Sequence, residues 1–339
     1  MNTILLISII SLAFNCWIIN FFANKLGDFL DEIAYRLKMT SSVKGVLFDG
    51  ISSSIPELLT SVVAALAVLG VFSAPDPTAF SDVGVGTIGG SAIFNILIIP
   101  FLSLLFISSD KVDTLEIDKK AMIRDLTIYL ISVGILYIGT MLGELNQMLG
   151  IALVVLYSLY ALFLIKTGKN QEETTIVEEN SRPHINKSML TLCGIAILTL
   201  IPIGISVHMC VEAATKIGLQ LHISRMIMSL VVLAATTSIP DTLLSIRSAR
   251  NGELDASISN AVGSNSFDIC IALGLVLAIS AISVKVDAND VLFVFKFLIL
   301  SSICYTLAFM TNTNKNIKMA ILFSPYAAFL YYVGVNLNY

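Results

Sequence analysis

The sequence predicts an all-α integral membrane protein whose ten transmembrane helices form two inverted five-helix repeats. The first observation is composition: 56% of the 339 residues are hydrophobic and 13% are charged, whereas soluble domains carry about a quarter charged residues. The second is that the chain divides into ten apolar stretches long enough to cross a bilayer. The third is that one markedly polar connection, residues 167–187, leaves five stretches on each side. An odd number in each half turns the second half upside down relative to the first.

The ten expected spans follow from hydropathy over windows of about 20 residues. They lie near residues 2–24, 43–72, 81–108, 123–142, 146–166, 188–216, 223–249, 256–284, 288–310 and 318–336. The first has no basic segment ahead of it, so it is expected to be a spanning helix rather than a cleaved signal. The expected organisation is a first repeat over 1–166, a linker over 167–187 and a second repeat over 188–339.

The basic residues predict which way the chain lies in the membrane. Lys and Arg fill the first, third and fifth connections, and the second and fourth contain neither. By the positive-inside rule the linker is cytoplasmic and both termini are outside, as expected for a protein of the plasma (inner) membrane. Lys216 and Arg225 fall on an outside turn. An i,i+4 ion pair between Glu212 and Lys216 is expected to explain the lysine.

Several functional classes are disfavoured by residue usage. The net charge is −4 and no long basic run occurs, which disfavours nucleic acid as a partner. The five cysteines and three histidines are scattered, so neither disulfides, a zinc site nor a hydrolase site is expected. Residues 84–89 (GVGTIG) match a dinucleotide fingerprint but lack a preceding strand. We therefore expect no enzyme activity and no cofactor.

A pair of motifs occurs twice, each time inside apolar sequence. Ser54–Glu57 reads SIPE and Ser238–Asp241 reads SIPD. Downstream, Gly90–Ile96 reads GSAIFNI and Gly263–Ile269 reads GSNSFDI. Each SIP motif is predicted to break a helix at its proline, with a carboxylate just after the break. Duplicated broken helices are the sequence feature that indicates a transporter binding site.

The first motif predicts a cation site. In a soluble protein, Ser-x-Pro-Glu is typical of a helix N-cap. In mid-membrane, however, unsatisfied backbone groups cost several kcal/mol, and acidic residues are functional by default. The turns before the prolines are expected to leave carbonyls of Ser53 and Thr237 free. Together with Glu57 and Asp241 they form an all-oxygen set that suits a hard cation such as Ca²⁺ or Na⁺.

The second motif predicts the facing wall of the same site. Ser91 and Asn95 are spaced i,i+4, as are Ser264 and Asp268, so each pair shares one helix face. Nearby glycines are expected to allow close approach of this wall to the broken helices.

These two motifs resemble the alpha repeats of the cation/calcium exchanger (CaCA) superfamily of membrane antiporters, over about residues 45–105 and 230–280. The resemblance implies a site between helices 2, 3, 7 and 8. It implies Glu57 and Asp241 as central Ca²⁺ ligands, aided by carbonyls of Ser53 and Thr237. It also places Na⁺-site positions at Gly50, Ser54, Ser91, Ala234, Ser238 and Ser264, with Asn95 and Asp268 at mid-site.

Within that superfamily the sequence around Asp241 and Asp268 is more similar to the potassium-dependent sodium/calcium branch, and the Gly-Asn-x-x-Glu repeat of proton-coupled members is missing. Two departures are Ser52-Ser53, where Gly-Thr or Gly-Ser is usual, and Asp49, which is interpreted as lying at the cytoplasmic mouth with Lys44. The resemblance implies exchange of external Na⁺ for internal Ca²⁺, with either K⁺ or a proton accompanying Asp268.

Three alternatives stay open at this point. The first is a Ca²⁺/H⁺ or other cation antiporter of the same fold. The second is a cation channel, although repeated broken helices suit alternating access better than a continuous pore. The third is an intramembrane aspartyl protease, whose Gly-x-Gly-Asp and Tyr-Asp motifs are missing from this sequence.

Overall fold

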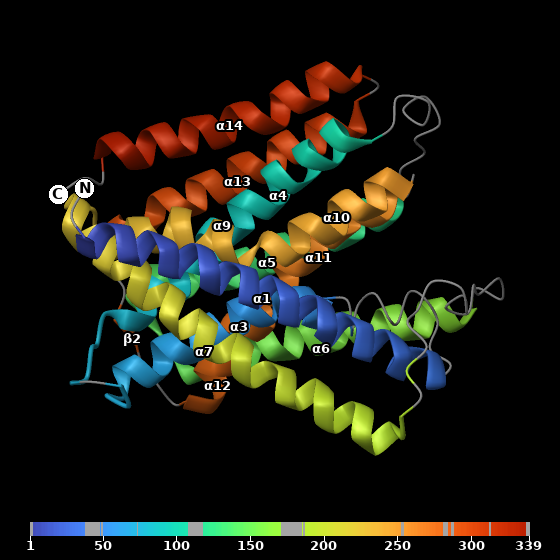
Figure 1. Ribbon diagram of the computed structural model, residues 1–339. Helices are drawn as coiled ribbons and strands as arrows, with labels where there is room; N and C mark the ends of the chain where they lie inside the picture. The colour runs from blue at the N-terminus through green and yellow to red at the C-terminus, as the bar shows by residue number, and fades with distance from the viewer. Residues whose placement is uncertain are drawn as a thin grey trace.

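The computed structural model is a bundle of long helices (Figure 1). It describes residues 3–37, 48, 50–72, 74–107, 118–170, 185, 187–251, 254–280, 284–285, 288–311 and 313–336. The first half contains α1 (Thr3–Arg36), α3 (Gly50–Val68), the π-helix η2 (Phe80–Val85), α4 (Gly86–Phe106), α5 (Lys119–Met141) and α6 (Gln147–Asn170).

The second half contains α7 (Met189–Leu221), α8 (Arg225–Ile227), the π-helix η5 (Met228–Leu233), α9 (Ala234–Thr237), α10 (Ile239–Asn251), α11 (Leu254–Phe267), the π-helix η6 (Asp268–Leu273), α12 (Gly274–Ser280), α13 (Ala288–Met310) and α14 (Lys315–Asn336). Among the described residues nine helices are long and apolar enough to cross a membrane, and a bent pair over 225–237 and 239–251 makes the tenth. The predicted all-α fold of two five-helix halves is therefore confirmed.

The helices divide into an inner group and a lipid-facing group. In Figure 1, α1 and α7 run side by side along one face, and α13 and α14 pack together on another. Large apolar side chains on α1 are exposed, and Trp17 keeps 61% of its surface accessible. Such a surface is suited to lipid and not to water. By contrast, α3, α4, α10 and α11 pack against one another in the centre.

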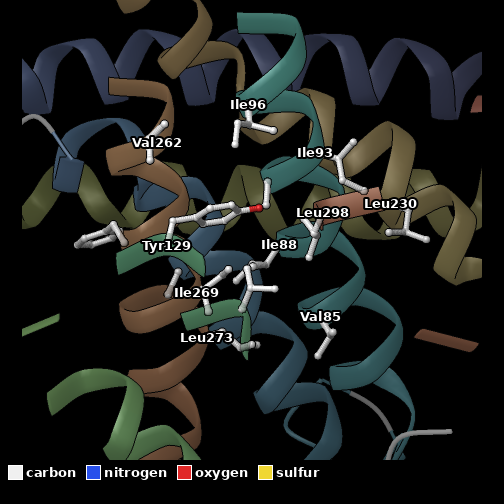
Figure 2. Close-up of a cluster of buried hydrophobic side chains, with 14 of the residues drawn as sticks. Val85, Ile88, Ile93, Ile96, Tyr129, Leu230, Val262, Ile269, Leu273 and Leu298 are labelled. Atoms are coloured by element: carbon white, nitrogen blue, oxygen red, sulfur yellow. The ribbon is translucent and has the colours of Figure 1, made fainter. Parts of the chain in front are cut away.

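Helix α4 is the central element of the apolar core (Figure 2). Its residues Ile88 and Ile93 are 1% and 0% exposed. Around them lie Tyr129 of α5, Leu230 of η5 and Leu298 of α13, all essentially buried. Because these neighbours come from both halves, the apolar packing of α4 joins the two repeats.

The first helix is longer than the sequence predicted, since α1 extends to Arg36 and not to residue 24. Its polar end is stabilised by side-chain pairs one turn apart, Lys25 with Asp28 at 3.0 Å and Arg36 with Glu32 at 2.7 Å. Arg36 also donates to the carbonyl of Ile185 at 2.7 Å. A hydropathy window stops at charged residues, whereas a helix continues through them when they are paired.

The predicted break at the first proline is wrong. Helix α3 runs without interruption from Gly50 through Pro56 to Val68. In the second repeat the break is present, and α10 is bent by 44° from the preceding helix at Ser238. Asp49 and Lys44, interpreted as a cytoplasmic mouth, lie outside the described residues.

The two membrane sides can be named from the connections. We call the side of the α3–η2 connection the loop side, and the side where α6 ends and α7 begins the linker side. On the loop side, β1 (Glu144–Leu145) pairs antiparallel with β2 (Val284–Lys285). On the linker side, the guanidinium of Arg250 lies 5.0 Å over the ring of Phe106.

An ion network joins the two halves on the loop side. Arg225 at the start of α8 donates to Asp82 at 2.8 Å and also to Asp76 and Thr78 in the α3–η2 connection. The guanidinium holds the pKa of Asp76 below its ordinary value, so this carboxylate stays charged at neutral pH. Lys216 pairs with Glu212 at 2.8 Å, which confirms the predicted helix-end ion pair.

Candidate ion-binding site

The carboxylates of the two repeated motifs come together at the centre of the molecule. Glu57 lies on α3, Asp241 on α10 and Asp268 at the start of η6, and each is fully buried. Glu57 and Asp241 lie near each other, and Asp268 lies near both. Asn95 on α4 is also fully buried. The sequence expectation that helices 2, 3, 7 and 8 meet here agrees with this arrangement.

A network of hydroxyl groups connects the two halves at this point. The Oγ atoms of Ser91 and Ser238 lie 2.9 Å apart. Ser91 also lies within 3.5 Å of Glu57 Oε1 and 3.4 Å of Asp268 Oδ2. The amide of Asn95 donates to Ser91 Oγ at 3.2 Å. Ser91 is therefore in reach of four of the polar residues predicted for the site.

The contacts of the two carboxylates mirror each other, as an inverted repeat requires. Ser264 donates to Asp241 at 2.7 Å, and Ser91 occupies the corresponding place beside Glu57. The Ser53 side chain approaches Asp241, and that of Thr237 approaches Glu57. The residue before each SIP motif, Ser53 or Thr237, therefore has its hydroxyl close to the carboxylate of the other half.

The starts of the two motif helices are also mirrored. The hydroxyl of Ser53 lies 3.5 Å from the carbonyl of Gly50, and that of Thr237 lies 3.2 Å from the carbonyl of Ala234. The backbone oxygens in these contacts belong to Gly50 and Ala234, two of the predicted Na⁺-site positions. Ser53 itself lies inside the unbroken helix α3, so the prediction that a turn before Pro56 leaves its carbonyl free is wrong. The predicted site residues are thus gathered in a single region.

Five buried oxygen atoms in this region have no hydrogen-bond partner. They are Ser54 Oγ, Glu57 Oε2, Asn95 Oδ1, Asp241 Oδ2 and Asp268 Oδ1. A buried polar atom without a partner costs about 1–3 kcal/mol, and a buried unpaired charge costs more. Within the part of the chain that the structure describes, no Lys, Arg or His pairs with the three carboxylates. The residues therefore fit bound cations, which would satisfy all five oxygens.

The arrangement limits how many carboxylates one ion can contact. Among the described residues, no three side chains of Asp, Glu, His or Cys gather around one point. An ion held by the side chains in these positions would take hydroxyl, amide and carbonyl oxygens as ligands besides carboxylates. That mixture is typical of Ca²⁺ and of monovalent hard cations.

The sequence reasoning missed several polar residues near the site. Asn265 donates to the carbonyl of Ala92 at 2.9 Å, and its own Oδ1 has no partner. Ser61 and Thr87 are fully buried with unpartnered hydroxyls, and Asn260 approaches Asp241. Ser61 is four residues from Glu57 and Thr87 four from Ser91. The i,i+4 rule that selected the known candidates could have found both.

Comparison with known proteins identifies relatives across most of the chain. The family model described as sodium/calcium exchanger protein matches residues 7–166 and 191–335. The inner membrane protein YrbG of Escherichia coli is 29% identical over 237 residues, which are 68% of this chain and 67% of that protein. Human sodium/potassium/calcium exchanger 3 is 46% identical over 77 residues, which are 23% of this chain and 12% of that exchanger.

Solved structures share the fold. A structure of the sodium–calcium exchanger NCX_Mj has a TM-score of 0.62 at 20% identity and covers 96% of this chain and 99% of that one. The structure of the H⁺/Ca²⁺ exchanger CAX has a TM-score of 0.65 at 12% identity and covers 96% and 89%. With the family model matched over both halves, this multi-pass membrane protein belongs to the sodium/calcium exchanger family of the cation/calcium exchanger superfamily.

Proposed function

We propose that the protein is a secondary antiporter that exchanges Na⁺ for Ca²⁺ by alternating access. The observation that carries the proposal is the set of five unpartnered oxygens buried between helices of both halves. Such a set needs cations, and a site at the interface of inverted repeats is suited to exposure on alternate sides. The full burial of Glu57, Asp241 and Asp268 favours this over a channel, because a channel needs a continuous aqueous path.

Ca²⁺ and Na⁺ are proposed to compete for the same ligands. Both ions prefer oxygen, and the mirrored hydroxyls beside Glu57 and Asp241 serve one ion at a time. A Ca²⁺ ion between these two carboxylates is neutralised by them. Sodium ions that replace it would use the same carboxylates with Ser54, Ser91, Ser238 and Ser264. Counter-transport then follows, since occupancy by one ion displaces the other.

Asp268 is proposed to need a further positive charge. If all three carboxylates are ionised, one Ca²⁺ leaves a negative charge in a buried site, and this costs several kcal/mol. A K⁺ ion or a proton on Asp268 would remove that cost. The likeness to sodium/potassium/calcium exchanger 3 supports K⁺. A proton is the alternative, and coupling of Ca²⁺ to H⁺ instead of Na⁺ is the second candidate function.

Flux measurements in proteoliposomes separate these choices. We expect Ca²⁺ uptake to be driven by an opposing Na⁺ gradient, and to be stimulated by K⁺ on the Ca²⁺ side because K⁺ compensates Asp268. Asp268→Asn is expected to retain Ca²⁺ transport but to lose the K⁺ stimulation. Membrane potential is clamped so that K⁺ acts only as a ligand.

The opposite outcomes are distinct. If wild-type Ca²⁺ flux does not change with K⁺ but depends on pH through Asp268, a proton on Asp268 takes the place of K⁺ and the protein is a plain Na⁺/Ca²⁺ exchanger. If Ca²⁺ uptake is driven by a pH gradient and does not depend on Na⁺, the Ca²⁺/H⁺ function replaces the proposed one.

We propose that both termini lie on the outer side of the membrane and that the linker is cytoplasmic, as the Lys and Arg distribution requires. In a variant without the five native cysteines, single cysteines near Asn2 and Asn338 should react with an impermeant reagent added to intact cells. One near Glu173 should react only after permeabilisation. Reaction of the linker cysteine in intact cells would reverse the proposed orientation.

A further inference from the structure

Four polar side chains lie one helical turn away from the central ligands, and their placement follows the inverted repeat. Ser61 comes four residues after Glu57, and Ser245 comes four residues after Asp241. On the facing helices, Thr87 comes four residues before Ser91, and Asn260 comes four residues before Ser264. Residues at this spacing share a helix face and are displaced by about 5–6 Å along its axis.

The chain direction sorts these residues into two layers. Helix α3 leads from the site towards the loop side, and α4 returns from the loop side to the site. Ser61 and Thr87 therefore both lie on the loop side of the central carboxylates. In the second half the directions are reversed, so Ser245 and Asn260 both lie on the linker side. We call the first pair the loop-side layer and the second pair the linker-side layer.

The hydroxyls of the loop-side layer lack the partners that buried hydroxyls in helices usually have. Ser or Thr in an apolar helix normally donates to the carbonyl four residues earlier. Thr60 does so, with Pro56 O at 2.8 Å, and so does Ser266, with Val262 O at 3.2 Å. Ser61 and Thr87 are fully buried, yet neither hydroxyl has a hydrogen-bond partner. Packing alone does not explain a hydroxyl at either position.

The linker-side layer is instead hydrogen-bonded and continues away from the site. Asn260 donates to Ser245 Oγ at 3.0 Å and also approaches Asp241. Ser245 lies 3.4 Å from the carbonyl of Ser257, and the Oγ atoms of Ser257 and Ser103 are 2.6 Å apart. These groups lie between α4, α10 and α11. Together they make an unbroken line of oxygen and amide groups from Asp241 towards the linker side.

We infer that the two layers are transfer sites, at which a cation exchanges water for protein oxygens between the central site and each side of the membrane. A Ca²⁺ ion that loses all its water at once faces a large desolvation cost. Hydroxyl and amide oxygens one turn from the carboxylates replace part of that water first. Ions that enter or leave on the loop side exchange their water at the loop-side layer. Ions that enter or leave on the linker side do so at the linker-side layer.

The inference rests on the proposed cation exchange, and its test is sidedness. Ca²⁺ flux is measured in membrane vesicles of both orientations, with Ca²⁺ varied at one face at a time. Ser61→Ala and Thr87→Val should raise the half-saturating Ca²⁺ concentration at the loop-side face by about tenfold, which corresponds to losing one oxygen ligand. In these two variants the half-saturating Ca²⁺ concentration at the linker-side face should stay within about twofold of the wild-type value. Ser245→Ala should instead raise it at the linker-side face and leave it nearly unchanged at the loop-side face.

Matched variants control for structural damage. Thr60→Val and Ser266→Ala remove hydroxyls that donate hydrogen bonds within their own helices. They should leave the half-saturating Ca²⁺ concentration unchanged at both faces. Thr87→Ser keeps the hydroxyl and should restore the wild-type value. Because Ser61 and Thr87 have no partner to lose, their variants should have an unchanged or higher thermal unfolding temperature.

Two outcomes would overturn the inference while leaving the proposed function intact. One is an equal change at both faces for every variant, which indicates a shared structural role. The other is normal half-saturation at both faces in Ser61→Ala and Thr87→Val. A wild-type protein that exchanges no Ca²⁺ would contradict the proposed function itself.

Discussion

Glu57→Gln and Asp241→Asn are each expected to lower Na⁺-driven Ca²⁺ flux at least about a hundredfold, since removing one partner of a buried charge pair costs about 3–5 kcal/mol. Each change removes the charge of one of the two fully buried carboxylates, Glu57 and Asp241, that are proposed to neutralise Ca²⁺. The measurement is Ca²⁺ uptake into proteoliposomes at a fixed Na⁺ gradient. Glu212→Gln is the control, because Glu212 is an exposed helix-end residue paired with Lys216.

A stability measurement separates loss of the site from loss of the fold. Without ions, ionised carboxylates at Glu57, Asp241 and Asp268 would repel one another, so neutralising one should keep or raise the unfolding temperature. Ca²⁺ should stabilise the wild type, because a ligand that binds only the folded state shifts the unfolding equilibrium. That Ca²⁺-dependent rise should vanish in both variants. Normal transport by both would refute the site.

Gly90→Ala is expected to destabilise the protein by about 1–3 kcal/mol or more, because it overpacks a rigid contact. A Cβ atom at Gly90 would meet the backbone carbonyl of Leu230 and lie 2.8 Å from Cβ of Ala234. Backbone atoms cannot rotate away as a side-chain end can. The change would push α4 away from η5 and α9 and would therefore also impair flux. Thermal unfolding of the purified protein in detergent measures the cost.

Gly263→Ala is the matched control, because Gly263 is the counterpart of Gly90 in the repeated motif. A Cβ atom there would meet nothing within 4 Å. The substitution is expected to stabilise α11 by about 0.5–1 kcal/mol, the usual preference for Ala over Gly inside a helix. Equal losses from both substitutions would show that the two repeats pack alike at this position.

The large-scale fold was predictable from the sequence because membrane insertion depends on composition over about 20 residues. Hydropathy found ten spans, and the odd count in each half implied their inversion. The boundaries were less predictable, since α1 continues to Arg36 through a charged end that side-chain pairs stabilise. Hydropathy contains no information about such pairs.

The candidate site was predictable as a set of residues because polar groups in an apolar span are rare and expensive. Glu57, Asp241, Asn95 and Asp268 could be selected on that ground alone. Ser61 and Thr87 escaped notice because serine and threonine commonly bond to their own helix. Their i,i+4 spacing from Glu57 and Ser91 and the absence of that bond in the structure distinguish them from Thr60.

By itself, the sequence determined the membrane fold, the inverted repeat and the polar residues at its centre, since each depends on residue type and spacing along one chain. Tertiary structure alone decided how the two copies differ. Ser54–Glu57 lies in an unbroken helix, whereas the chain bends by 44° at Ser238. Likewise Gly90 packs against η5 while Gly263 faces open space. Corresponding motifs have different neighbours in three dimensions, and those neighbours set their conformation and their tolerance to change.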